Sequence, residues 1–330
     1  MPSRRANVSA TCVVTSPTID VITYTPVIES IALLPHRLVD VLRLDKIHPV
    51  ISGNKWFKLK HNVLKAKAQG KKTILTFGGA HSNHLAAAAE ACKLYGLNSI
   101  AIVRGEDSRG KTLRVAEAAG MRVVKVSRSD YALKNETDYL TFLQEQYGDC
   151  YVIPEGGNNA DGIRGCMDIL APLNEYDYVC CACGSGATFA GLVASTKNTC
   201  IPVGISVLKG PNRLAASVQT QLQEAFPDKQ FKVDTELSAN ETAIPCVLNT
   251  YAFSGFAAHD PFLVTYKNTF EQKHGITLDY LYTTKLFYAT EDLLSTQKIP
   301  ENARVLVIHS GGLQGNEAFE QRYGIETAER

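Results

Sequence analysis

Short apolar runs alternate with amphipathic stretches along most of this chain. Apolar runs of this length, bounded by polar or glycine-rich turns, are typical of buried strands. The predicted strands are residues 73–77, 99–104, 121–126, 150–154, 178–182, 202–207 and 304–309, and the predicted helices between them include 85–97, 110–119 and 135–147. Strands that alternate with helices indicate a mainly parallel sheet covered on both faces. The pattern therefore predicts an α/β protein with two open parallel sheets.

One lysine stands at the entry to a predicted helix. In ISGNKWFKLK (51–60), Lys55 follows Gly53 and Asn54, and a helix-forming run continues to Gly70. Glycine allows a bulky group to approach the backbone closely, and a lysine amine held there forms a Schiff base with a carbonyl cofactor. The alternative is a solvated lysine, because most lysines are exposed and several others are close by in the sequence.

A second segment, TFGGAHSNH (76–84), joins a predicted strand to an alanine-rich helix. Gly78 and Gly79 end the strand, and either Ser82 or Asn83 suits the N-cap of the helix. Capping is the structural explanation of these polar residues. The functional explanation is that the same helix start offers free backbone N–H groups to an anion such as a substrate carboxylate.

A third segment, GSGAT (184–188), again lies between an apolar run and a helix of small residues. Glycines in this position let backbone N–H groups surround a phosphate, and Ser185 and Thr188 add hydroxyl groups. A Gly-x-Gly turn is weak support by itself. Its extension GSGATF is similar to a dinucleotide fingerprint, but Phe189 replaces the third glycine. The next strand ends in Lys209 and Gly210 rather than in a ribose-binding acid, so a nicotinamide enzyme is not favoured.

Composition excludes some classes of partner. The 330 residues suffice for about two domains, and 34 basic against 33 acidic residues leave a net charge of +1. No basic face is indicated, so nucleic acid and anionic membranes are not expected as partners. No apolar run reaches the roughly 18 residues that a membrane span needs.

The nine cysteines help to predict the cellular compartment of the protein. Their number is odd, and Cys180, Cys181 and Cys183 lie together on a predicted strand. CCxC lacks the second ligand pair of a zinc site, so small buried side chains explain the cluster and no metal is expected. This usage favours a reducing, cytoplasmic location. Arg4 and Arg5 precede a short Ala/Val/Ser stretch, but residues 1–22 lack a signal-peptide core and are expected to form an irregular arm.

Several motifs occur together in one order: SGNKWFKLK, TFGGAHSNH, IVRGE (102–106), PEGG (154–157), GIRGCMDI (162–169), GSGAT, LDYLYTTKLFY (278–288) and IHSGGLQG (308–315). From Leu44 to Gln321 the chain resembles the 1-aminocyclopropane-1-carboxylate deaminase and D-cysteine desulfhydrase family. These are pyridoxal-phosphate enzymes of the tryptophan synthase β-like fold, fold type II. The resemblance implies a small inserted α/β domain at 58–168, a large cofactor-binding domain at 1–57 and 169–330, and a homodimer acting on a small amino acid.

The same resemblance implies roles for particular residues. The cofactor, pyridoxal 5'-phosphate, would be held covalently by Lys55, whose amine then becomes the base for the α-proton. Asn83 would contact the ring hydroxyl, and Ser310 the ring nitrogen. The catalytic residues would be Lys55, Ser82 and Tyr282. The other cofactor-binding residues would be Asn54, Asn83, Gly184, Ser185, Gly186, Ala187, Thr188 and Ser310, and the substrate-binding residues would be Ser82, Asn83, His84, Phe256 and Tyr282.

The substrate is predicted from departures within the family. In the ring-opening deaminases a glutamate follows the tyrosine and a leucine precedes the final Gly-Gly, whereas Thr283 and Ser310 stand here. A hydroxyl beside the ring nitrogen does not keep it protonated, which favours β-elimination over transamination. We therefore expect D-cysteine to yield pyruvate, ammonia and hydrogen sulfide. Phe256 in place of a tyrosine, DYLYTTK in place of DPVYTGK, and Ala187 in place of a glycine depart from the usual pattern.

Two alternatives stay open at this point. One is ring opening of 1-aminocyclopropane-1-carboxylate. The other is a non-catalytic protein that binds an amino acid or the cofactor, although a pure binder has no need of Lys55.

Overall fold

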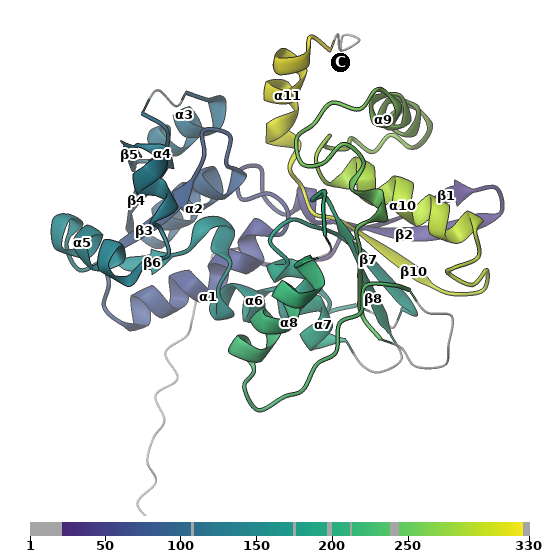
Figure 1. Ribbon diagram of the computed structural model, residues 1–330, viewed down its shortest axis with the longest axis horizontal. Coiled ribbons are helices and arrows are strands. Elements are labelled where there is room, and N and C mark those ends of the chain that lie inside the picture. The colour runs from purple at the N-terminus through teal and green to yellow at the C-terminus, as the bar shows by residue number, and fades with distance from the viewer. Residues whose placement is uncertain are drawn as a thin grey trace, which may run out of the picture.

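Two lobes, each built on its own sheet, make up the protein (Figure 1). The computed structural model describes residues 22–106, 109–173, 176–196, 200–211, 213–237 and 244–325. The expected N-terminal arm therefore lies almost entirely outside the described residues. No helix in these described ranges is long and apolar enough to cross a membrane. They also contain no group of three or more His, Cys, Asp or Glu side chains arranged to hold a metal ion.

The smaller sheet has four parallel strands in the order β5-β4-β3-β6. Its strands are β3 (Thr73–Gly78), β4 (Asn98–Arg104), β5 (Met121–Val126) and β6 (Tyr151–Ile153). One face packs on α1 (Lys55–Ala68), α2 (Asn83–Tyr95) and α3 (Lys111–Ala118), and the other on α4 (Arg128–Ala132) and α5 (Thr137–Tyr147). Each parallel connection passes through a helix, as parallel pairing requires.

The larger sheet has six strands in the order β1-β2-β10-β7-β8-β9, and only the β1–β2 pair is antiparallel. Its strands are β1 (Ile28–Leu34), β2 (Arg37–Arg43), β7 (Tyr178–Cys183), β8 (Ile201–Ser206), β9 (Cys246–Leu248) and β10 (Val305–His309). The helices α6 (Ala160–Cys166), α7 (Ala187–Ser195) and α8 (Arg213–Ala225) cover one face, and α9 (Pro261–His274) and α10 (Thr283–Ser295) the other. A last helix, α11, spans Asn316–Tyr323.

Side chains along β7 point alternately to the two faces of the larger sheet, and both faces are buried. Cys180 and Ala182 pack in the core under α9 and α10, whereas Cys181 and Cys183 pack in the core under α6 to α8. Successive side chains of a strand point to opposite faces, so a strand covered on both sides needs a continuous apolar run. The cysteine cluster is accordingly a buried part of the sheet.

The predicted α/β fold with parallel sheets is confirmed, with one correction. The larger sheet is mixed, because β1 and β2 form an edge hairpin that the sequence pattern did not reveal. Its turn places His36 at φ 64° without a glycine, so the usual sequence signal of a tight hairpin is missing. The strands of the smaller sheet all lie within residues 73–153, and we retain a division at residues 58 and 168 as a proposal.

Candidate active site

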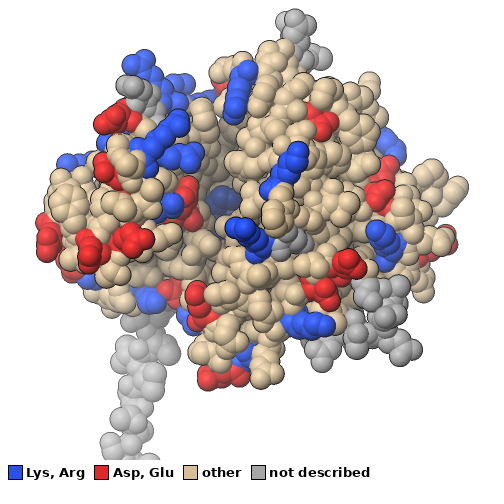
Figure 2. All heavy atoms as spheres, viewed as in Figure 1, with Lys and Arg blue, Asp and Glu red and all other residues tan. Residues whose placement is uncertain are grey.

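A cavity of about 770 Å³ opens between the two lobes, and Figure 2 shows it as a hollow in the surface. The segments that follow β3, β7 and β10 all contribute to its lining. Ligands of open α/β sheets bind outside the carboxyl ends of the strands, because the connecting loops and helix starts converge there. The cavity therefore lies where the fold favours a binding site.

Lys55 is the first residue of α1 and projects into this cavity. Its Nζ donates a hydrogen bond of 2.6 Å to Oδ1 of Asn54, and Nδ2 of Asn54 donates one of 2.7 Å to Oγ1 of Thr188. Burial, with a smaller contribution from the neighbouring Lys58, lowers the pKa of Lys55 to about 7. A large fraction of the Lys55 amine is therefore neutral, and nucleophilic, near pH 7.

The loop that carries Lys55 lies directly against the end of β10. The backbone N–H of Asn54 donates to the carbonyl oxygen of Ser310 at 3.3 Å. Gly53 has φ +70°, and a Cβ atom placed on it would lie 1.8 Å from the same oxygen. Only glycine permits this approach without displacing a backbone. Lys55 and Ser310 are thus held in a fixed relation by direct backbone contact.

The GSGAT segment forms the start of α7. Gly186 has φ 91° at the N-cap, and no side chain caps this helix. The first N–H groups of a helix lack partners within it, so this start can hold an anion. Thr188 is buried one residue inside the helix and lines the cavity. Gly184 lies against the ring of Tyr282, because a Cβ atom added to Gly184 would lie 3.1 Å from a carbon of that ring.

The SNH segment forms a second helix start on the opposite side of the cavity. Ser82 occupies the N-cap of α2, but its side chain makes no capping hydrogen bond. Asn83 reaches across to the other lobe, where its Nδ2 lies 3.5 Å from the carbonyl oxygen of Gly312. Oδ1 of Asn83 is buried without a hydrogen-bond partner. Such an unsatisfied acceptor is costly and indicates that a donor of a ligand belongs there.

His84 is a neutral, buried histidine. Oγ1 of Thr76 lies 2.8 Å from the carbonyl oxygen of Ile153 and 2.8 Å from Nε2 of His84. The carbonyl can only accept, so Thr76 donates to it and accepts from Nε2–H. Burial, together with Lys55 and Lys58, lowers the pKa of His84 to about 3. The expected substrate contact of His84 would therefore involve an uncharged ring.

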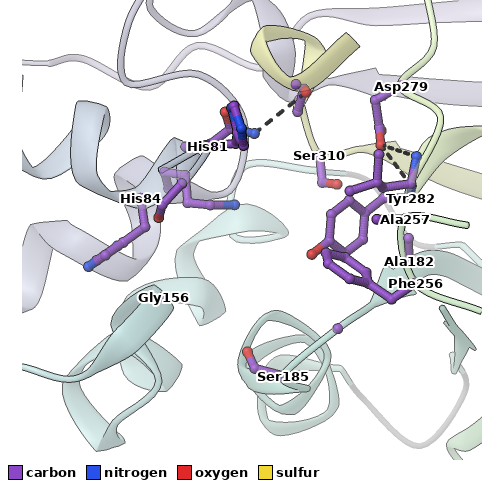
Figure 3. Close-up of a pocket in the computed structure, with 18 of the residues that line it drawn as sticks. His81, His84, Gly156, Ala182, Ser185, Phe256, Ala257, Asp279, Tyr282 and Ser310 are labelled. Atoms are coloured by element: carbon purple, nitrogen blue, oxygen red, sulfur yellow. Dashed lines mark hydrogen bonds between the residues drawn. The ribbon is translucent and has the colours of Figure 1, made fainter. Parts of the chain in front are cut away.

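Aromatic rings form the wall opposite α2. The rings of Phe256 and Tyr282 meet edge to face at 5.7 Å, and both line the cavity (Figure 3). The carboxylate of Asp279 accepts hydrogen bonds from the N–H groups of Leu281, Tyr282 and Thr283 and from the Thr283 hydroxyl. Asp279 thereby fixes the backbone that presents Tyr282. Thr283 is fully buried in this arrangement and is not among the residues of the cavity wall.

Lys58 and Asp279 are among the cavity residues that were not recognised from the sequence. Lys58, one of the lysines close to Lys55 in the sequence, is only 6% exposed and lines the cavity one helical turn after Lys55. The signal was its i,i+3 spacing from Lys55 on α1. Asp279 gave no comparable signal, because an acid next to a helix start usually only caps it.

The structure brings the expected site residues together at one cavity. Those in its lining are Asn54, Lys55, Ser82, Asn83, His84, Gly184, Ser185, Gly186, Thr188, Phe256, Tyr282 and Ser310. Ala187 is the exception, since its side chain is fully buried outside the cavity wall and only its place at the start of α7 relates it to the site. The individual roles given to these residues stay predictions.

These residues fit pyridoxal phosphate. Lys55 supplies an amine with a lowered pKa, and Asn83 supplies an unsatisfied acceptor. The uncapped starts of α7 and α2 supply N–H groups for a phosphate and a carboxylate, and Lys58 adds a buried amine to the same cavity. The donor set thus matches an aldehyde that carries a ring hydroxyl and a phosphate.

Comparisons with known proteins agree with this chemistry. A family model described as "Pyridoxal-phosphate dependent enzyme" matches residues 19–311. A Thermotoga maritima protein named "Putative 1-aminocyclopropane-1-carboxylate deaminase" is 31% identical over 83% of this chain and 88% of its own. An Arabidopsis thaliana protein named "Bifunctional D-cysteine desulfhydrase/1-aminocyclopropane-1-carboxylate deaminase, mitochondrial" is 27% identical over 80% of this chain and 70% of its own.

A solved structure extends the comparison to the fold. The crystal structure of an ACC deaminase homologue superposes with a TM-score of 0.78 at 24% identity, covering 93% of this chain and 95% of that one. At that identity the likeness supports the fold alone. The family match and the Thermotoga relative show more: this chain belongs to the pyridoxal-phosphate dependent enzymes, in the family of 1-aminocyclopropane-1-carboxylate deaminase and D-cysteine desulfhydrase.

Proposed function

We propose that this enzyme catalyses β-elimination from D-cysteine or a closely related β-substituted D-amino acid, releasing pyruvate, ammonia and hydrogen sulfide. The observation that carries the proposal is the residue after Tyr282. It is Thr283, whose hydroxyl is bound to Asp279 and is turned away from the cavity. A carboxylate that could serve ring opening is therefore missing from this position.

The chain's own residues account for the steps of such a reaction. Pyridoxal phosphate, when bound, supplies an electron sink for the bond that breaks at the α-carbon. The start of α7, with Thr188 and Lys58, would hold its phosphate, and the start of α2 would hold the substrate carboxylate. Lys55 then takes the α-proton at its Nζ, and its lowered pKa suits a general base near pH 7.

Two further residues set the direction of the reaction. Ser310 lines the cavity and would contact the ring nitrogen. A hydroxyl is too weak a base to keep that nitrogen protonated, which would favour loss of the β-substituent. The hydroxyl of Tyr282 lies on the substrate side and donates a hydrogen bond to the leaving group or to the base. Burial raises the pKa of Tyr282 above its ordinary value, so this hydroxyl keeps its proton at neutral pH.

Ring opening of 1-aminocyclopropane-1-carboxylate is the second candidate, and the name of the Thermotoga relative favours it. A coupled assay for keto acids, with sulfide detection, separates the two. Purified holoenzyme is offered D-cysteine, L-cysteine and the cyclopropane acid in parallel. We expect pyruvate and sulfide from D-cysteine and little product from the cyclopropane acid. Turnover of the cyclopropane acid without turnover of D-cysteine would overturn the proposal.

The assembly and location of the enzyme are also proposals. We infer a homodimer in the cytoplasm, supported by the family resemblance and by the eight described cysteines, all of which are free thiols. Sedimentation analysis of the holoenzyme measures the assembly directly, and a monomer at micromolar concentration would contradict it.

A further inference from the structure

A loop at residues 252–257 forms the outer part of the substrate-side wall. Phe256 and Ala257 line the cavity, and the Phe256 side chain is 48% exposed. Its ring meets Tyr282 edge to face at 5.7 Å (Figure 3). The position of this loop therefore decides how much room a substrate side chain has beside Tyr282.

The loop has an unfavourable backbone conformation. Phe253 and Ala257 have φ values of 52° and 54°, and Gly255 has 102°. Non-glycine residues rarely occupy this region, and they persist there only where the surroundings hold them. The turn also directs the carbonyl oxygens of Ala252 and Gly255 toward one point, close to the carbonyl of Val207 at the end of β8. Convergent carbonyl dipoles repel one another unless a donor lies between them.

Lys285 supplies that donor. Its Nζ donates hydrogen bonds of 2.8 Å to the carbonyl oxygens of Ala252 and Gly255, and lies 3.5 Å from that of Val207. An ammonium group has three N–H donors, and three carbonyl oxygens surround this one. The two more distant carboxylates that favour its charge are Asp260 and Asp279.

Burying Lys285 is energetically unfavourable unless its ammonium group has hydrogen-bond partners. The side chain is 1% exposed, and lysines are almost never buried unless they are paired. Lys285 is also in the first turn of α10, where the helix dipole disfavours a cation. Burial lowers its pKa to about 8, so the ammonium form still prevails at neutral pH. Binding to the carbonyls of the loop explains why a lysine occupies this position.

We propose that Lys285 is a positioning residue for substrate recognition, whose buried ammonium holds loop 252–257 so that Phe256 closes the substrate side of the cavity against Tyr282. Lys285 is not among the residues that line the cavity, so it acts through the loop. The inference rests on the proposed function only for the identity of the substrate.

Lys285→Met tests the proposal, because methionine keeps the length and removes the donors. Lys267→Met is the matched control: Lys267 is also 1% exposed, but its Nζ pairs with Glu271 on the same helix. Three quantities are measured on the cofactor-loaded proteins, namely amide hydrogen exchange of peptides covering 250–257, cofactor affinity, and KM and kcat for D-cysteine.

For Lys285→Met we expect loop exchange about 10-fold to 100-fold faster, as for the loss of charged hydrogen bonds. KM should rise about 10-fold with kcat within about threefold, since the loop binds substrate without touching the reacting atoms. Cofactor affinity should stay unchanged, and Lys267→Met should leave loop exchange and KM as in the wild type. Unchanged loop exchange in Lys285→Met, or a loss of cofactor affinity as large as the rise in KM, would overturn the proposal.

A second pair of variants covers the case in which Lys285→Met does not fold. Gly255→Ala changes the residue that supplies one of the acceptor carbonyls, at φ +102°. Gly120→Ala, at φ +93°, carries a similar backbone penalty with no atom within 4 Å of its Cβ position. Faster loop exchange and a raised KM are expected only for Gly255→Ala, and equal behaviour of the pair would refute the inference. Exchange needs no substrate, so it distinguishes a failure of this inference from a failure of the proposed function.

Discussion

Replacing Gly53 by alanine should separate the lysine loop from the end of β10. The added Cβ would lie 1.8 Å from the carbonyl oxygen of Ser310, whereas ordinary contacts begin at 3.4 Å. The two backbones must therefore move apart by roughly 1.5 Å, because neither contact partner is a flexible side-chain end. That movement breaks the hydrogen bond from Asn54 N–H to Ser310 and shifts Lys55 with it.

The size of the effect follows from two contributions. Alanine at a left-handed position costs about 1 kcal/mol by itself, and losing the buried hydrogen bond adds about 1–3 kcal/mol. Gly70→Ala isolates the first contribution, because Gly70 has φ +71° and no atom within 4 Å of its Cβ position. We expect Gly53→Ala to lose about 2 kcal/mol more of the free energy of unfolding than Gly70→Ala.

Cofactor titration measures the functional consequence. A displacement of about 1 Å at a reacting group costs on the order of 100-fold, so Gly53→Ala should bind pyridoxal phosphate at least about 10-fold more weakly. Gly70→Ala should bind it like the wild type. If the two variants bind the cofactor equally well, the contact between the lysine loop and Ser310 does not position Lys55.

Four further outcomes are expected. Thr188→Ala should weaken cofactor retention by about 1–3 kcal/mol, and Gly186→Val should weaken it more, because its Cβ would lie 2.6 Å from Val218; normal retention by Gly186→Val on titration would mean that the phosphate binds elsewhere. Ser310→Asp should shift products from elimination toward transamination, and an unchanged product ratio would count against the ring-nitrogen contact. The rate of covalent cofactor attachment should rise about tenfold per pH unit up to about pH 7 and then level off, because Lys55 is protonated below its pKa of about 7 and neutral above it; a rise that continues to pH 10 in stopped-flow absorbance would contradict the lowered pKa.

Local sequence patterns predicted the elements whose signals are local. The apolar run Met121–Val126 became β5 with the same bounds, and the glycine-rich segments became helix starts as expected. The β1–β2 hairpin was not predicted. It joins the larger sheet where β2 pairs with β10, from the far end of the chain, and local sequence carries no signal for that pairing. Its turn residue His36 also lacks the glycine that such turns usually need.

Within the site, sequence patterns did not reveal which polar side chains are buried or which way they point. Lys58 and Lys60 look alike in the sequence, yet only Lys58 is buried at the cavity. Thr283 aligned with a catalytic position, but its hydroxyl is bound to Asp279. Which way a polar side chain points depends on the packing of neighbouring elements, and a single sequence does not contain that information directly.

Borohydride reduction of the cofactor-loaded enzyme, followed by peptide mapping, tests the central claim most directly. Lys55, which is partly buried, and Lys58, which is buried, line the same cavity one helical turn apart, so the peptide and its fragment ions must be resolved to the residue. The account predicts a reduced pyridoxyl group on Lys55, and none on Lys58. Label on Lys58 or on any other lysine, or no label on protein that contains the cofactor, would contradict it.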